Sequence, residues 1–169
     1  MEVEIKFKVD ESIRERIREI AKFVCEKVET DLYFNSPIRD FKKTDEALRV
    51  RIDSEGVKIT YKGPKIDSET KTREEIEIKV DSYEKAVELL KKLGFTPFKE
   101  IVKRREIYKL EDVTICLDNV KELGTFLEIE VKSDQIDYAK NKIFDVARRL
   151  GLDPTSSIRK SYLELIINR

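Results

Sequence analysis

Three short charged segments share one spacing of acidic and basic residues. The pattern Glu-x-Glu-x-Lys occurs at Glu2, Glu4 and Lys6, at Glu75, Glu77 and Lys79, and at Glu128, Glu130 and Lys132. Alternate side chains of a β-strand share a face, so each segment would carry its charges on one face and its apolar residues on the other. Such a face suits a metal ion held together with a polyanion. It is also typical of a solvated face with cross-strand ion pairs, and the spacing leaves both interpretations open.

Other predicted strands carry charges at the same two-residue spacing. Arg49 and Arg51 form one pair, Lys103 and Arg105 form another, and Lys62 ends a further strand. Such side chains lie roughly 7 Å apart along a strand, so converging strands could surround a compact anion from several sides. Oxygen ligands without His or thiolate suit Mg²⁺ or Mn²⁺. The spacing is therefore consistent with a metal and polyphosphate site if these faces converge.

The composition excludes several classes of function. The chain has 169 residues, 40% of them hydrophobic, which suits one domain, residues 1–169, with its own core. Its 35 basic and 35 acidic residues cancel, so no long-range field attracts nucleic acid or an anionic membrane. Without His, catalytic Ser-His and Cys-His pairs and His-ligated zinc are excluded, and five scattered glycines form no P-loop. Any phosphate must therefore be bound by Lys and Arg side chains.

Composition also bears on where the protein works. Cys25, in a helical pattern, and Cys116, in a strand pattern, lack metal or redox spacing. No stretch approaches a membrane span of about 20 apolar residues, so we expect a soluble, cytoplasmic protein. The charged fraction of 41%, with one Met and no Trp, resembles the ion-pair-rich surfaces of thermophile proteins.

Periodicity predicts an α+β fold that positions these charges. Two-residue alternation predicts strands at residues 2–9, 30–36, 47–53, 57–62, 73–80, 98–110, 113–119 and 125–132. Helical spacing predicts helices over residues 11–28, 81–93 and 136–150, and a docking helix over residues 157–167. Each Glu-x-Glu-x-Lys segment thus leads into a helix. The helices should cover the apolar side of the sheet, leaving the charged side toward water or the lumen of a closed barrel.

Several segments together resemble one known family over nearly the whole chain. They are the opening Glu2-x-Glu4-x-Lys6, TDLYFNSPIRDFKKTDEALRVR from Thr30, TYKG from Thr60, REEIEIKV from Arg73, KRRE from Lys103, LDNVKELGTFLEIE from Leu117 and KSYLEL from Lys160. In this order they resemble the CYTH superfamily, the triphosphate tunnel metalloenzymes. The TDLYF and DEALRVR segments most resemble its class IV adenylyl cyclase branch, including archaeal and thermophile members.

The resemblance implies a closed eight-stranded antiparallel β-barrel, with helices packed outside, whose tunnel binds a triphosphate and a divalent metal, Mg²⁺ or Mn²⁺. It implies metal ligands among Glu2, Glu4, Asp118, Glu128 and Glu130, with Lys6 joining Glu2, Glu4, Glu128 and Glu130 in catalysis. It implies phosphate contacts from Lys6, Arg49, Arg51, Lys62, Lys103, Arg105 and Lys160. The branch includes dimers, so a homodimer is an expected assembly.

The expected reaction is that of an adenylyl cyclase, in which the ribose 3′ oxygen of ATP attacks the α-phosphorus and pyrophosphate leaves. The alternative is a triphosphatase, in which the same residues direct water onto the terminal phosphorus of inorganic triphosphate, thiamine triphosphate or a nucleotide. Both are metal-assisted displacements, so the phosphate-binding residues do not separate them. A module that binds polyphosphate or nucleotide without turnover is a third hypothesis, and a purely structural protein is a fourth.

Overall fold

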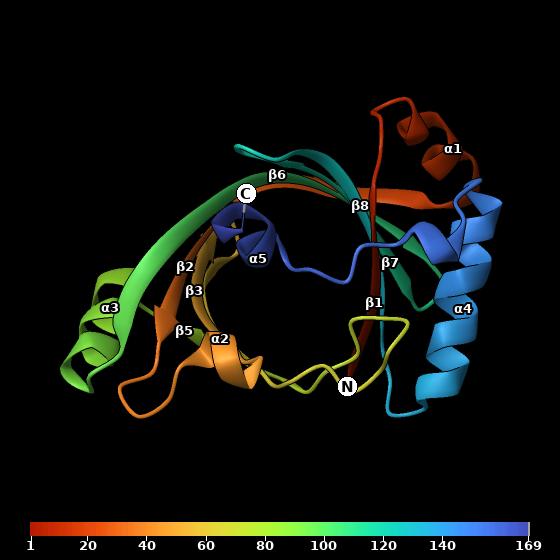
Figure 1. Ribbon diagram of the computed structural model, residues 1–169. Coiled ribbons are helices and arrows are strands. Elements are labelled where there is room, and N and C mark those ends of the chain that lie inside the picture. Colours follow the sequence, from red (N-terminus) through yellow and green to blue (C-terminus); the bar gives the residue numbers. More distant parts are fainter. Residues whose placement is uncertain (169) are drawn as a thin grey trace.

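The computed structural model describes residues 1–168 and contains one large antiparallel sheet (Figure 1). The strands are β1 (Glu2–Lys8), β2 (Lys22–Asn35), β3 (Ala47–Asp53), β4 (Gly56–Lys62), β5 (Glu75–Val80), β6 (Thr96–Leu110), β7 (Val113–Val120) and β8 (Gly124–Lys132). The helices are α1 (Ile13–Ile20), α2 (Phe41–Thr44), α3 (Tyr83–Lys92), α4 (Ile136–Arg149), η1 (Pro154–Ser156) and α5 (Tyr162–Ile167). The strand order is β1-β8-β7-β6-β2-β3-β4-β5, and every neighbouring pair is antiparallel. The predicted α+β class and eight antiparallel strands are confirmed.

The sheet is curled, but it is not the closed barrel that was expected. Its edge strands β1 and β5 do not pair with each other among the described residues. Instead, the segment before β5 reaches β1 through an isolated bridge between Glu2 and Arg73, with backbone N–O distances of 3.0 and 3.1 Å. Lys71 N also donates to Glu4 O at 2.9 Å. Closure is incomplete because only this short connection, and not strand β5, lies against β1.

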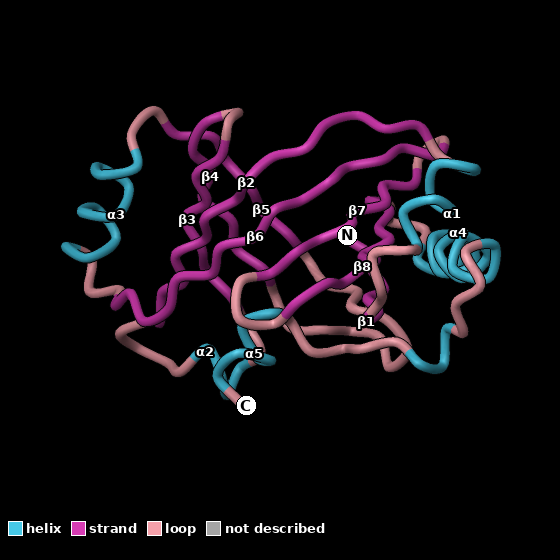
Figure 2. The backbone as a smooth tube through the Cα atoms, turned by 90° about the horizontal axis from the view of Figure 1, so that it is seen from above, coloured by secondary structure: helices cyan, strands magenta, loops and turns pink. Residues whose placement is uncertain are grey.

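Helices α1, α3 and α4 cover the outer, convex side of the curl. Val3, Ile5 and Phe7 of β1 alternate with its charged residues and pack in one core with residues of α1 and α4, such as Ile17 and Ile143. Helix α3 packs in a second core against β3. Figure 2 shows α3 at one end of the sheet and α1 with α4 at the other. Each Glu-x-Glu-x-Lys strand does lead into a helix, as predicted, because the apolar face of the strand requires a cover.

The first predicted helix was too long. Helix α1 ends at Ile20, and β2 begins at Lys22, so Cys25 lies in a strand and not in a helix. Ile13 and Ile17 are buried, whereas Val24 and Val28 of the expected stripe are about half exposed. Strand β2 pairs along its whole length with β6, and this long-range pairing outweighs the local helical spacing.

The short helix α5 lies on the opposite side of the sheet from helices α1, α3 and α4. Helix α5 starts at Tyr162, later than the predicted docking helix, where Ser161 and Glu164 form a capping box. Figure 1 shows α5 inside the curl, where Tyr162 and Ile166 pack in an apolar cluster with Ile101 of β6. Within residues 1–168, none of the helices is long and apolar enough to span a membrane.

Candidate functional site

A cavity of about 870 Å³ occupies the concave side of the sheet. All eight strands contribute to its wall, together with the connection before β5 and helices α2 and α5. The sequence-predicted residues that line it are Glu2, Glu4, Lys6, Arg49, Arg51, Lys62, Lys103, Arg105, Glu128 and Glu130. Curling the sheet therefore brings the charged faces of distant strands together around one space, and the alternative of a solvated face does not describe them.

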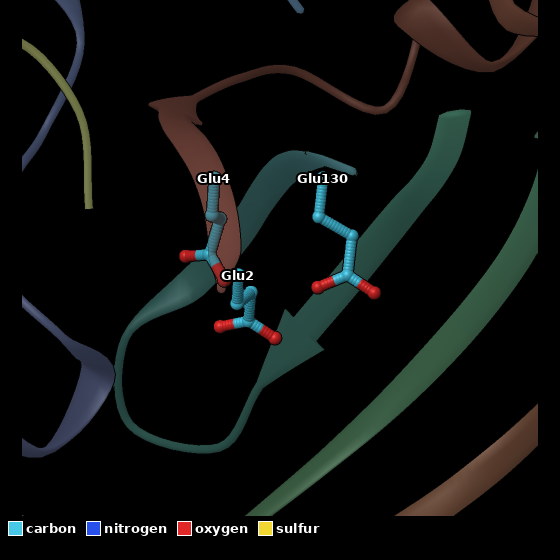
Figure 3. A group of neighbouring side chains, drawn as sticks. All are labelled: Glu2, Glu4 and Glu130. Atoms are coloured by element: carbon cyan, nitrogen blue, oxygen red, sulfur yellow. The ribbon is translucent and has the colours of Figure 1, made fainter. Parts of the chain in front are cut away.

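Three carboxylates meet at one side of this cavity. Glu4 and Glu130 are direct partners across the β1–β8 ladder, and Glu2 lies two residues before Glu4 on the same face. One oxygen from each of the three lies within 4.8 Å of the other two (Figure 3). Burial and the neighbouring Glu128 carboxylate raise the pKa of Glu4 to about 7, and burial with the charges of Glu2 and Glu4 raises that of Glu130. A divalent cation would relieve this repulsion.

The donor set fits a hard divalent ion. All three groups offer carboxylate oxygens, which Mg²⁺ and Mn²⁺ prefer. Glu4 Oε2 is buried and has no hydrogen-bond partner among the described residues. Lys71 Nζ lies 3.0 Å from it as an ion pair, but without hydrogen-bond geometry. A divalent cation bound to this oxygen would share it with Lys71.

Arg49, on β3, is a buried cation without an ion-pair partner in the described chain. Its side chain lines the cavity, it is only 9% exposed, and its Nε has no hydrogen-bond partner. Asp31 and Glu75 stabilise the charge of Arg49 from beyond ion-pair distance. An anionic ligand in the cavity would supply the direct contact that the described chain does not.

Four other predicted phosphate-binding cations, Arg51, Lys62, Lys103 and Arg105, already form ion pairs with carboxylates of the protein. Arg51 forms two hydrogen bonds to Asp31, with Nε–Oδ1 at 2.6 Å and Nη2–Oδ2 at 2.8 Å. Lys103 Nζ donates to Asp31 Oδ2 at 3.0 Å, and Lys62 Nζ donates to Glu2 Oε1 at 3.1 Å. These contacts fix the cations in the cavity wall while leaving them beside its open space.

Two predicted site residues do not reach the cavity wall in the described structure. Asp118, on β7, is fully buried and accepts hydrogen bonds from Arg105 and from the hydroxyl of Tyr162. The Lys160 side chain is exposed, and its backbone carbonyl accepts a hydrogen bond from Lys6 Nζ at 3.0 Å. Asp118 thus lies behind Arg105, and Lys160 contributes through its main chain.

Sequence reasoning missed several residues of the site. Lys71 lines the cavity from the connection before β5, where no strand alternation marks it, and Arg73, at the start of the predicted strand over residues 73–80, lines it without having been assigned a role. Glu29 lines it from β2, and Asp31, two residues on, supports two of its cations. Their Glu-x-Asp spacing resembles that of the Glu-x-Glu segments, and this signal could have identified them.

Glu75 and Glu77, to which no role was assigned from the sequence, also line the cavity. Glu75 lies 3.6 Å from Lys62 Nζ and 3.5 Å from Lys132 Nζ, and all three line the cavity. Glu77 accepts a hydrogen bond from the Thr60 hydroxyl at 3.0 Å. The second Glu-x-Glu segment therefore faces the same space as the first and third.

Comparison with known proteins identifies the family. The CYTH domain model matches residues 1–162. A Methanocaldococcus jannaschii protein, whose name proposes that it is an adenylate cyclase, is 44% identical over 171 residues that cover 98% of each chain. The adenylate cyclase CyaB of Aeromonas hydrophila is 29% identical over 81% of this chain and 71% of that protein.

Solved structures agree with this match. A Pyrococcus horikoshii protein superposes with a TM-score of 0.92 at 44% identity, covering 99% of both chains. A Hippeastrum protein, named as a proposed adenylyl cyclase and described as revealing a dominant triphosphatase activity, shares the fold, with a TM-score of 0.67 at 20% identity over 90% of this chain and 89% of that one. The chain belongs to the CYTH family.

Proposed function

We propose that this chain is a metal-dependent enzyme that converts ATP to cyclic AMP and pyrophosphate. One observation carries the proposal: the buried guanidinium of Arg49, which forms no ion pair in the described part of the chain, and the carboxylates of Glu2, Glu4 and Glu130 face the same cavity. A metal–triphosphate complex presents a cation to the carboxylates and phosphate oxygens to the guanidinium, so it matches both halves at once. A purely structural protein would have no use for either.

In this proposal the three glutamates hold Mg²⁺ or Mn²⁺. When bound, the metal withdraws charge from the phosphoryl oxygens of the substrate and of the leaving pyrophosphate. Glu128 has a different position, because its Oε1 accepts a hydrogen bond from Arg105 Nη2 at 2.7 Å. We assign Glu128 to the orientation of Arg105, next to the carboxylate cluster.

The cations of the wall hold the triphosphate. They come from β1, β3, β4 and β6: Lys6, Arg49, Arg51, Lys62, Lys103 and Arg105. Their fixed positions favour the charge that builds up on the phosphate oxygens as the leaving group departs. In the reaction a bond forms between the ribose 3′ oxygen and the α-phosphorus, and the bond from that phosphorus to pyrophosphate breaks. The hydroxyl proton passes to solvent.

An apolar rim supports a nucleotide over a bare triphosphate as the substrate. Tyr33, Phe98, Leu163 and Ile167 line the same cavity as the charged residues. Phe98 is 49% exposed and Ile167 is 40% exposed, so their surfaces are open to a planar group. Pockets of roughly 300–1,000 Å³ hold drug-sized organic molecules. At about 870 Å³ the cavity exceeds the needs of an inorganic ion.

Triphosphate hydrolysis is the second candidate. It is favoured by the Hippeastrum protein, which shares this fold and is described as having a dominant triphosphatase activity. There, water rather than the ribose oxygen would attack, at the terminal phosphorus of inorganic triphosphate, thiamine triphosphate or a nucleotide. Binding without turnover is a third candidate. The carboxylate cluster and the cations of the cavity wall would bind a metal–triphosphate complex in the same way without a reaction.

Product analysis separates these candidates. The purified protein is incubated with Mg²⁺ or Mn²⁺ and with ATP or inorganic triphosphate, and Glu4→Gln serves as the matched inactive variant. Cyclic AMP with pyrophosphate is the expected result for ATP. Orthophosphate release would favour the triphosphatase, and tight binding without products would leave the binding module. Turnover that is equal in wild type and Glu4→Gln would refute the site itself.

A further inference from the structure

We propose that Tyr162, at the start of the C-terminal helix α5, is a positioning residue for the triphosphate site, and that Asp118 acts with it rather than as a metal ligand. The proposal rests on the proposed function, because it assigns these residues to the cations that hold the triphosphate. Two independent contacts of Tyr162 carry it, one through the hydroxyl group and one through the ring.

The hydroxyl group of Tyr162 supports Arg105 through Asp118. Tyr162 is buried, and its hydroxyl donates a hydrogen bond to Asp118 Oδ2 at 2.7 Å. The same carboxylate accepts Arg105 Nε on Oδ1 at 2.7 Å and Arg105 Nη2 on Oδ2 at 2.7 Å. Both oxygens of Asp118 are thus engaged, and the two-point contact fixes the plane of the guanidinium. Arg105 can therefore present its remaining edge to the cavity in only one orientation.

The ring of Tyr162 supports Lys6. Lys6 Nζ lies 3.9 Å from the ring centroid, a short cation–π distance, and it also donates to Lys160 O at 3.0 Å. Both contacts come from the segment that leads into α5. A lysine side chain has many rotamers, and holding it in one before the ligand arrives removes an entropic cost of binding.

Helix α5 is itself held in place, so it can act as a rigid support. Ile158 N donates to Lys6 O at 2.7 Å, and Lys65 Nζ, from the connection after β4, donates to Glu164 Oε1 at 3.2 Å. The capping box of Ser161 and Glu164 fixes the first turn, where Tyr162 lies. One helix turn thereby aligns cations from β1 and β6, which are far apart in sequence.

The location of Asp118 argues against direct metal binding. The carboxylates whose oxygens lie within 4.8 Å of one another are Glu2, Glu4 and Glu130, and Asp118 is outside this group and outside the cavity wall. Asp118 is fully buried, and both of its oxygens accept hydrogen bonds from Arg105, so a metal ion bound there would have to compete with that guanidinium. Its effect on the substrate must therefore pass through Arg105.

The test compares Tyr162→Phe with a matched control. The Phe variant keeps the ring, and so the packing against Phe126 at a centroid distance of 5.2 Å, but it removes the hydroxyl. Tyr138→Phe removes a hydroxyl from an exposed tyrosine on α4, which lies 3.5 Å from Asp112. Titration calorimetry measures the affinity for inorganic triphosphate and, separately, for Mn²⁺.

Tyr162→Phe should weaken triphosphate binding about tenfold, as expected when a hydrogen bond to a charged group is lost, and should leave Mn²⁺ affinity unchanged. Tyr138→Phe should change neither the triphosphate affinity nor the Mn²⁺ affinity. Equal triphosphate affinity in wild type and Tyr162→Phe would overturn the positioning role. A wild-type protein that binds no triphosphate would instead refute the proposed function, so the two failures are distinguishable.

Asp118→Asn tests the second half of the proposal. It should reduce triphosphate affinity and leave Mn²⁺ affinity intact, whereas Glu4→Gln should reduce Mn²⁺ affinity. Because Tyr162 and Asp118 act on the same guanidinium, the double variant should lose less than the sum of the two single losses. Loss of Mn²⁺ binding in Asp118→Asn, or strictly additive losses in the double variant, would overturn the assignment.

Discussion

Replacing Arg49 by methionine should separate function from stability. In the described structure Arg49 is buried in the cavity wall without an ion-pair partner, and its Nε has no hydrogen bond. Arg51, two residues along the same strand, is also buried but is paired with Asp31 through two short hydrogen bonds. The two arginines therefore share a strand, a face and a degree of burial, but of the two only Arg51 forms a direct ion pair with a carboxylate of the described chain.

The two variants should differ in how strongly each lowers the free energy of unfolding. A hydrogen bond to a charged group contributes about 1.5–3 kcal/mol, so Arg49→Met should weaken triphosphate binding by roughly 10- to 150-fold. Its free energy of unfolding should change by less than about 2 kcal/mol, because no ion pair is broken and only the longer-range attraction of Asp31 and Glu75 is lost. Arg51→Met leaves Asp31 with less compensation and should lower the free energy of unfolding by about 3–5 kcal/mol.

Urea denaturation of both variants and of wild type, without triphosphate, measures the stability differences, and calorimetric titration with inorganic triphosphate measures affinity. Added triphosphate should raise the melting temperature of wild type far more than that of Arg49→Met. If Arg49→Met were destabilised as strongly as Arg51→Met, or if it bound triphosphate as tightly as wild type, the reasoning from its missing partner would be refuted.

Three further predictions concern the carboxylates, the rim and pH. Glu130→Gln should lower Mn²⁺ affinity at least about tenfold, because one of three ligands loses its charge; unchanged affinity in calorimetry would contradict the cluster. Phe98→Ser should weaken ATP binding and leave inorganic triphosphate binding unchanged, and equal losses for both ligands would argue against the rim as a nucleoside contact. Burial would raise the pKa of Asp31, but the charges of Lys103 and Arg51 hold it well below its usual value. The ionised form of Asp31 therefore stabilises the fold above about pH 4, and this contribution is lost as the pH falls further. The difference in unfolding free energy between wild type and Asp31→Asn should therefore be constant from pH 7 to about 5 and narrow below pH 4. A difference as large at pH 2 as at pH 7 would show that the charge of Asp31 is not its source.

Strand positions were predictable from the sequence where alternation was regular. The predicted strand at residues 47–53 matches β3, because Leu48 and Val50 face one way and Arg49 and Arg51 the other. Prediction was wrong where two periodicities overlapped. Apolar residues up to Val28 fitted a helical stripe, yet β2 begins at Lys22, because this segment pairs with the distant strand β6.

By itself, the sequence determined which side chains share a face of each strand and which family the chain resembles, since both depend on local spacing and on ordered motifs. Only the tertiary structure decided which charges meet. Arg105 contacts Asp118, Lys6 lies over Tyr162, and Arg49 is left unpaired, although all are cations on charged faces. The physical reason is that pairing across the curl depends on strand register and on the course of the C-terminal segment. These are set by contacts between residues far apart in the chain, which a two-residue period does not encode.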